Sequence, residues 1–151
     1  MKIVRLVEEK VLSMVAKVLG VIEGEVSYQS FEMILKQELD GLGCEILKLV
    51  LEELDCVLKA DEGRKKEWEV VRKADAKGIL TPFGMVNYSR TYYQHKESKK
   101  YSYLVDQKAG IEPNSRVSEN LKAELVDASA VMSYEHTTEE LSRYNGDLKV
   151  S

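Results

Sequence analysis

The chain has 151 residues, of which 44% are hydrophobic and 32% are charged, and its formal net charge is −4. This length fits one domain, or one domain with a helical extension, and is sufficient to bury a core. The acidic balance excludes a uniformly basic nucleic-acid-binding protein, but it leaves open a local basic surface.

The charged residues are strongly segregated along the chain. Residues 1–62 carry 7 Lys/Arg against 13 Asp/Glu, which is a net charge of −6. Residues 63–116 carry 12 against 6, a net +6, and residues 117–151 carry 3 against 7, a net −4. The middle segment is therefore the expected anion-facing surface.

The two cysteines indicate a reducing compartment, and the apolar N-terminal run is typical of neither a membrane span nor a signal peptide. Cys44 and Cys56 are twelve residues apart, about 120° round a helix, so they point to different faces and we expect reduced, buried thiols. The run Val11–Ile22 is interrupted by Lys17 and is shorter than the about 20 residues that span a membrane. It also lacks a basic leader. We expect a cytoplasmic protein with no membrane partner.

The first third of the chain predicts two helices. Valines recur at three- and four-residue steps, at Val4, Val7, Val11, Val15 and Val18. They predict an amphipathic helix that ends at Gly20. The break from Gly24 to Ser30 offers Ser27 or Ser30 as the N-cap of the next helix.

The second predicted helix runs from Phe31 to Lys59, with a bend near Gly41 and Gly43. Its apolar positions cover more than one narrow stripe: Leu42, Ile46, Leu47, Leu49, Val50, Leu51, Leu54, Val57 and Leu58. A helix with so wide an apolar arc packs on two neighbours, or on one neighbour and a partner subunit.

Short β-rich runs follow Asp61–Gly63. They are Trp68–Val71, Ile79–Leu80, Met85–Tyr93 and Tyr101–Val105, with turns at Pro82–Gly84 and Lys96–Lys100. We expect an antiparallel meander of three or four strands. In the third run Val86, Tyr88, Arg90 and Tyr92 share one face, and Met85, Asn87, Ser89, Thr91 and Tyr93 share the other. This alternation does not decide which tyrosines belong to the core.

The pattern returns to helix after Gly110–Ser115. Ser118 is the expected N-cap of a helix whose apolar face is Leu121, Leu125, Ala128 and Met132. Ser133 would cap a short helix from Tyr134 to Tyr144, before a turn at Asn145–Asp147. Two short helices and a turn are typical of a helix-turn-helix before its recognition helix. The expected fold is α+β, divided into a helical region 1–62, a basic β region 63–112 and an incomplete helix-turn-helix 113–151.

The segment Thr81–Asp106 holds five of the eight tyrosines and lies in the basic middle of the chain. Aromatic rings interleaved with Lys and Arg on a hairpin suit a polyanion, because the cations meet phosphates and the rings stack. The alternative is a small sheet with tyrosines half-buried on one face.

Taken in order, these segments resemble the N-terminal region of the ISLre-type bacterial insertion-sequence transposases, a group long known as an uncharacterised protein family. The hairpin pattern T-x-F-G-x-V-x-[FY]-x-R-x-Y-Y is present from Thr81 to Tyr93, and Y-x-Y-L-[LV]-D from Tyr101 to Asp106. The other matching segments are Ser30-Phe31-Glu32 at a helix start, Leu54-Asp55 at a helix end, Gly63-Arg64-Lys65 before the sheet, Gly110–Pro113, Arg116–Leu121 and Met132–Ser142.

The resemblance implies a truncated transposase that keeps a DNA-binding or oligomerisation region. The family's nuclease is an RNase-H-like domain whose Asp and Glu residues bind Mg²⁺, and it lies outside these 151 residues. We therefore expect no enzyme activity, no catalytic residue, no metal site and no cofactor in this chain, and no small-molecule ligand. The expected partners are DNA of the element ends and, as an alternative, a second copy of the chain.

The candidate DNA contacts are the cations of the middle segment and two of its tyrosines. They are Arg64, Lys65, Lys66, Arg72, Lys73, Lys77, Arg90, Lys96, Lys99 and Lys100, with Tyr92 and Tyr93; Tyr88, Tyr101 and Tyr103 are stacking or core residues. Two alternatives remain open: a dimerisation module built on the helix 31–59, and an inactive remnant of a decayed mobile element. His95 and His136 are expected to be solvated, since no catalytic motif surrounds them.

Overall fold

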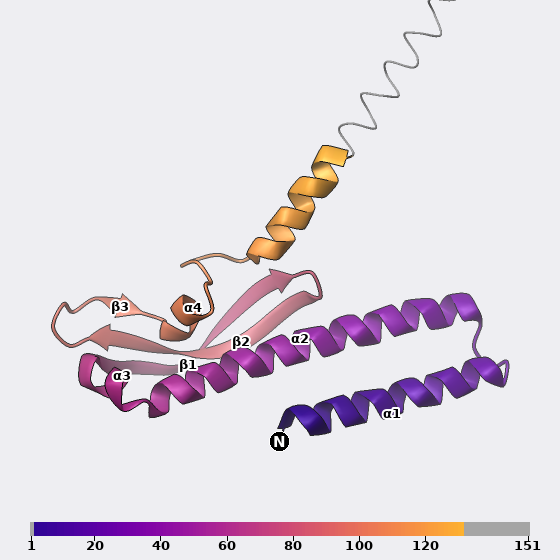
Figure 1. Cartoon of the computed structure of the whole chain (residues 1–151), viewed down its shortest axis with the longest axis horizontal. Coiled ribbons are helices and arrows are strands. Elements are labelled where there is room, and N and C mark those ends of the chain that lie inside the picture. The colour runs from indigo at the N-terminus through magenta and orange to yellow at the C-terminus, as the bar shows by residue number, and fades with distance from the viewer. Residues whose placement is uncertain (1, 132–151) are drawn as a thin grey trace, which may run out of the picture.

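The computed structural model describes residues 2–131, in which a long helical hairpin carries a small antiparallel sheet on one of its helices (Figure 1). The elements in chain order are α1 (Lys2–Ile22), α2 (Tyr28–Ala60), α3 (Glu62–Glu67), β1 (Trp68–Thr81), β2 (Gly84–His95), β3 (Tyr101–Ser102) and α4 (Leu104–Lys108). The strand order is β1-β2-β3, a simple meander. Residues 119–131 form a further helix that extends away from the sheet (Figure 1). The predicted α+β class is confirmed.

The two N-terminal helices are longer than the sequence predicts. α1 continues through Gly20 to Ile22, and Gly24, at φ +77°, makes the turn that Gly20 was expected to make. α2 starts at Tyr28 because Ser27, not Ser30, is its N-cap: the Ser27 hydroxyl accepts a hydrogen bond from the Ser30 N–H (3.2 Å). The helix also runs five residues past Asp55, the expected helix end of the family pattern.

The first strand joins two runs that the sequence kept apart. β1 continues from Trp68 to Thr81 because β2 pairs along its whole length, from Trp68↔His95 to Thr81↔Gly84. The polar middle of β1 is accommodated by register shifts between Val70 and Asp75, where Ala74 adopts φ +59°. Such a bulge twists the strand and leaves its extra residues outside the hydrogen-bond ladder.

The free edge of β2 is covered by carboxylates of α2. The N–H groups of Ser89 and Thr91 point away from β1 and donate to Glu52 and Asp55, both at 3.1 Å. Further along the same edge, β3 pairs with β2 at Tyr93↔Ser102. An unpaired strand edge is thus protected by a helix and then by a short strand.

Tyr88 and Tyr93 are the two buried tyrosines of the segment Thr81–Asp106, and Tyr101 is exposed. Burial along β2 changes face after Tyr88: Val86 and Tyr88 are buried first, and Thr91 and Tyr93 take over. The sequence could not decide this point, because a strand that is covered on different faces along its length has no single alternation.

Two short helices were not predicted. α3 occupies the basic segment before the sheet, and Asp61 caps it by accepting from the Arg64 N–H (2.6 Å). The predicted strand Tyr101–Val105 is wrong beyond Ser102, because Leu104 begins α4 and Val105 turns into the core. Local β propensity is outweighed here by the burial of Val105.

The core lies between α2 and the sheet. Its buried members are Ile79, Val86, Tyr88 and Val105, and partly buried side chains pack against them: Cys44, Leu47, Leu51, Leu54, Leu58 and Ile111. α2 contacts α1 on another side. The sheet therefore covers part of the wide apolar arc of α2, whereas Val50 and Val57 of this arc are exposed. A partner subunit on that part of the arc stays a prediction.

The remaining predictions concern the C-terminal segment, the two cysteines and membrane-spanning helices. Ser118 is confirmed as an N-cap, since its hydroxyl accepts from the Leu121 N–H at 3.3 Å. Met132 and the helix-turn-helix predicted from Ser133 onward lie outside the described residues. Cys44 is partly buried and Cys56 is exposed, so the expected burial of Cys56 is wrong. In residues 2–131 no helix is long and apolar enough to cross a membrane.

Candidate functional site

The twelve candidate DNA contacts separate into an internal and an exposed group. Lys77 and Tyr93 are buried, and Arg64, Arg90 and Tyr92 are partly buried. The other seven are exposed: Lys65, Lys66, Arg72, Lys73, Lys96, Lys99 and Lys100. The exposed group forms the outer surface that a large partner would meet.

Asp106 organises the first internal cluster. Its Oδ1 accepts a hydrogen bond from the Tyr88 hydroxyl (2.6 Å), and its Oδ2 accepts from Lys77 Nζ (3.2 Å) and from Arg90 Nη1. Burial and the bond to the Asp106 carboxylate raise the pKa of the Tyr88 phenol far above its ordinary value. From the sequence, Asp106 was identified only as the last residue of a motif. In the structure it binds two of the candidate cations, Lys77 and Arg90.

Arg64 stabilises the junction between α2 and the sheet. Its guanidinium donates to the carbonyls of Leu58 (3.1 Å), Lys59 and Trp68 (3.3 Å), and it lies 5.1 Å from the centre of the Tyr93 ring. Carbonyls at a helix C-terminus lack intrahelical donors, so an arginine is a favourable partner for them. Arg64 is thus fully engaged inside the protein.

Five exposed lysines lie at one end of the sheet, which we call the basic end: Lys65, Lys66, Lys96, Lys99 and Lys100. The turn between β2 and β3 is fixed to α3 there, because Lys96 donates through its backbone N–H to Glu67 O (2.8 Å) and through Nζ to Lys65 O (2.6 Å). The turn and α3 therefore present their lysines together. Lys65 also binds Glu62 at 2.5 Å.

A stack of aromatic and cationic side chains lies beside the basic end. The Tyr92 ring is nearly parallel to Tyr101, at 5.4 Å and 12°, and tilted against Tyr103 at 4.7 Å. The Arg72 guanidinium lies 4.6 Å from the centre of the Tyr92 ring. Tyr101, 54% exposed, is the outer member. One ring face of this kind can stack on a nucleic-acid base.

Asp75 fixes the bulged part of β1 to this stack. It accepts from Arg72 Nη2 (2.9 Å) and from the Tyr103 hydroxyl (2.9 Å). The hydrogen bond from Arg72, with that from Tyr103, holds the pKa of the Asp75 carboxyl below its usual value. Part of the Arg72 charge is therefore already neutralised within the protein.

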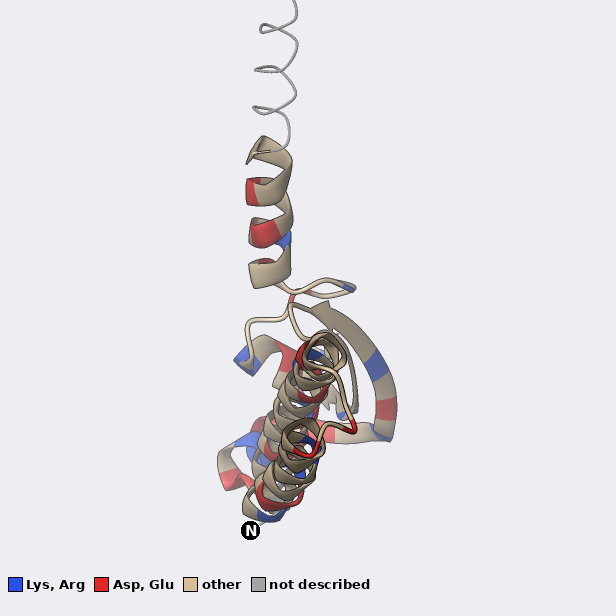
Figure 2. Ribbon diagram, turned by 90° about the vertical axis from the view of Figure 1, so that its right-hand side faces the viewer, with Lys and Arg blue, Asp and Glu red and all other residues tan. Residues whose placement is uncertain are grey.

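Acidic residues are interspersed with the basic ones. Glu67, Glu69 and Glu97 are exposed close in sequence to the lysines of the basic end. Figure 2 shows blue and red ribbon segments mixed along helices and strands. The segregation of charge seen in the sequence is thus partly lost in space, and no group of His, Cys, Asp and Glu among residues 2–131 has a metal-binding arrangement.

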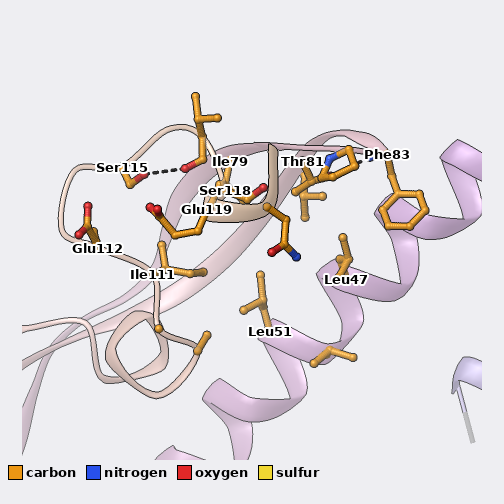
Figure 3. Close-up of a pocket in the computed structure, with 17 residues that line it drawn as sticks. Leu47, Leu51, Ile79, Thr81, Phe83, Ile111, Glu112, Ser115, Ser118 and Glu119 are labelled. Atoms are coloured by element: carbon orange, nitrogen blue, oxygen red, sulfur yellow. Dashed lines mark hydrogen bonds between the residues drawn. The ribbon is translucent and has the colours of Figure 1, made fainter. Parts of the chain in front are cut away.

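An apolar pocket of about 460 Å³ lies between α2, the tip of the β1–β2 hairpin and the segment 109–120. Figure 3 shows Leu47 and Leu51 of α2 facing the loop that carries Ile111. Phe83 lines the pocket and is about half exposed. None of the twelve candidate residues lines this pocket, which the sequence did not indicate. Its chemistry suits an apolar side chain rather than a charged ligand.

The described fold defines a small α+β protein in which a helical hairpin carries a three-stranded antiparallel meander. Residues 22–151 match the uncharacterised protein family UPF0236, and the chain belongs to this family. The expected family group is thereby confirmed, whereas its connection to ISLre-type transposases remains a proposal.

Relatives occur in Caldanaerobacter subterraneus subsp. tengcongensis. One UPF0236 protein of this organism is 40% identical over 114 residues, which cover 72% of this chain and 24% of the relative. A second is 39% identical over 105 residues, covering 70% of this chain and 22% of the relative, and its name joins eleven locus designations. The chain thus spans about a quarter of the length of these relatives. No solved structure matches it.

Proposed function

We propose that this chain is the DNA-binding and oligomerisation region of an insertion-sequence transposase. The observation that carries the proposal is the basic end with its adjoining tyrosine stack. Phosphates would be bound by Lys65, Lys66, Lys96, Lys99 and Lys100, and an unstacked base by Tyr101. Of the internal candidates, Arg64 and Tyr93 stabilise the junction between α2 and the sheet, and Lys77 and Arg90 are bound to Asp106 outside this surface.

The names of the relatives support a mobile genetic element. One name combines eleven locus designations of a single organism, and another combines four. Near-identical proteins from many loci of one genome are expected for a gene that is copied within it. The resemblance of the hairpin segment to ISLre-type transposases points in the same direction.

The test is the salt dependence of DNA binding by the 151-residue chain. Fluorescence anisotropy with labelled duplex and single-stranded 20-mers would be measured from 50 to 300 mM salt. We expect log Kd to rise linearly with log salt concentration, because bound lysines displace counterions. Replacing Lys99 and Lys100 by Glu should weaken binding and reduce the slope by about 2, or about 1 for each lost phosphate contact.

The matched control is the pair Arg5→Glu with Lys48→Glu. It changes the net charge by the same amount, but both residues are exposed on α1 and α2, away from the basic end. Equal loss of affinity in the control and the test pair would show a general charge effect and refute the basic end as the binding surface.

A second function, association with another copy of the chain, is favoured by the outward face of the helical hairpin. α1 turns polar residues toward α2: Lys10 binds Glu38 and Glu45, both at 3.7 Å, and Lys17 binds Glu38. Seven large apolar residues of this helix are exposed: Val4, Val11, Leu12, Val15, Val18, Leu19 and Ile22. So much exposed apolar surface on one helix is typical of an interaction site.

Four exposed apolar residues of the two helices fall on one face of the hairpin. Lys10 of α1 and Glu38 of α2 face each other across the hairpin. The next residue on each helix, Val11 and Leu39, points about 100° away from this contact. Val15 and Val50 follow Lys10 and Glu45 by five residues, or about 140°. Because the helices run antiparallel, rotation in the same sense brings both stripes to the same side.

Sedimentation velocity on the 151-residue chain tests this second function. We expect a dimer that Val15→Glu dissociates, because a charge would be buried in the apolar face. Ser13→Glu adds the same charge elsewhere on α1 and should leave the dimer intact. A strict monomer at high micromolar concentration would eliminate self-association as a function of this face.

A further inference from the structure

A second pocket, of about 510 Å³, is polar and lies between β1, β2 and the loop at 114–116. Lys77 and Gly78 of β1, Asn87 and Arg90 of β2, and Arg116 of the loop line it. Lys77 lies nine residues along β1 from Trp68, where the basic end begins, so the two sites are about 30 Å apart along the strand. Three cations therefore converge on a site that the proposed DNA surface does not include.

The charges behind this pocket do not balance. Asp106 is the carboxylate bound by both Lys77 and Arg90, and it offers one negative charge to two cations whose side chains are 6% and 14% exposed. Asp75, which also acts electrostatically on Arg90, is bound by Arg72 and Tyr103. Burying an uncompensated charge is costly, so one more anion would stabilise the cluster.

Arg90 has a donor that is not used within the described residues. Its Nη1 binds Asp106, and its guanidinium lies 3.5 Å from the centre of the Tyr103 ring, yet its buried Nε has no hydrogen-bond partner there. Buried donors in folded proteins are almost always paired, and a bound water or ion is one common partner of a donor that no protein group satisfies. The donor thus supplies a second observation in favour of an anion.

The third cation is held in place by its backbone. The Arg116 carbonyl accepts from the Leu80 N–H (2.8 Å), and the Ser118 N–H donates to Leu80 O (2.9 Å). These two bonds attach the loop to β1 as a parallel bridge at Leu80↔Val117. The exposed side chain of Arg116 makes no hydrogen bond or ion pair with the described residues and lines the pocket. It is available to a ligand.

We propose that this pocket binds a single phosphate group through Lys77, Arg90 and Arg116. Arginines give short, charge-assisted hydrogen bonds to phosphate oxygens, and the amide of Asn87 adds a neutral donor. The group is either inorganic phosphate or one backbone phosphate of a nucleic acid. The inference does not rest on the proposed function, because the charge imbalance and the unpaired donor exist whether or not the basic end binds DNA.

The experiment is an amide-resolved NMR titration of the 151-residue chain with two probes, at constant ionic strength. The probes are inorganic phosphate, with chloride as the competing anion, and a 20-base-pair duplex. We expect saturable shifts of the Gly78 and Asn87 amides. Arg116→Gln should weaken this binding about tenfold or more, as the loss of a charged hydrogen bond does. Lys108→Gln, at an exposed lysine of α4 outside the pocket, should leave it unchanged.

The two probes distinguish the sources of the phosphate. Shifts with inorganic phosphate identify a free oxyanion site, and shifts with the duplex alone, lost in Arg116→Gln, identify a backbone phosphate. If neither probe perturbs Gly78 and Asn87, or if Arg116→Gln binds as well as the parent chain, the proposal is overturned. Saturable phosphate binding without any duplex binding would refute only the DNA function.

Discussion

Asp55 of α2 accepts two hydrogen bonds from Thr91 of β2, one from the backbone N–H at 3.1 Å and one from the hydroxyl at 2.8 Å. The pair is buried, and it joins residues 36 positions apart. Lys59 binds the same carboxylate at 3.1 Å, and this hydrogen bond raises the pKa of the Lys59 ammonium. The long helix and the sheet are therefore locked together at one polar point.

Removal of the Asp55 carboxylate should destabilise the whole fold. Asp55→Ala leaves the Thr91 N–H and hydroxyl unsatisfied and should lower the free energy of unfolding by about 2–4 kcal/mol. Thr91→Val keeps the backbone bond and should cost about 1–2 kcal/mol. Urea denaturation measures both variants. Glu32→Ala, at an exposed site of α2, is the control, and a similar loss in it would contradict the assigned role of Asp55.

Arg64 should behave as a structural residue and its neighbour Lys66 as a surface charge. Arg64→Gln removes the donors to two carbonyls at the end of α2 and to one at the start of β1, and should cost about 1–3 kcal/mol of unfolding free energy. Lys66→Gln should change it by less than about 0.5 kcal/mol. Equal stability of the two variants in thermal and urea denaturation would show that Arg64 does not hold the helix end.

Two glycines of α2 should respond in opposite directions to the same substitution. At Gly41 an added Cβ meets nothing within 4 Å, whereas at Gly43 it would lie 2.5 Å from Phe83 Cδ1. Gly41→Ala should therefore stabilise the protein by about 0.5–1 kcal/mol through helix propensity. Gly43→Ala should be destabilising, because the hairpin tip must move. If Gly43→Ala proves as stable as Gly41→Ala, Phe83 does not pack against α2 in solution.

The pairing of α1 with α2 should weaken in acid. The hydrogen bond from Lys17, with its charge, lowers the pKa of Glu38. Because the pKa of Glu38 is lower in the folded chain than in the unfolded chain, its ion pair stabilises the fold fully above the unfolded pKa, about 4.3. This stability is lost as the pH falls through the folded pKa. Glu38→Gln should therefore be less stable than the parent chain at pH 6, and the difference should vanish near pH 3. A difference independent of pH in urea denaturation would exclude this ion pair as its source.

The sequence predicted secondary structure well where one local signal was dominant. Ser118, preceded by loop residues and followed by a periodic apolar face, was identified as an N-cap, and Pro82–Gly84 as the hairpin turn. It failed where two signals competed. Gly20 has the residue type of a helix end, yet α1 continues to Ile22 and the turn is made at Gly24.

The candidate site was less predictable than the fold. Lys77 and Lys99 look alike in the sequence, but one is buried on Asp106 and the other is exposed in a turn. A residue type specifies a charge, and only the position of the partner carboxylate decides whether that charge is used inside the protein.

The sequence by itself determined the family, the α+β class, the hairpin and the excess of positive charge between residues 63 and 116. Local patterning and composition suffice for these, since they depend on neighbours in the chain. Tertiary structure alone decided which face of β2 is buried, which cations are available to a ligand, and that Lys10 and Lys17 of α1 form ion pairs with α2. Each of these depends on contacts between residues far apart in the chain, such as Asp106 with Lys77 and Glu38 with Lys17.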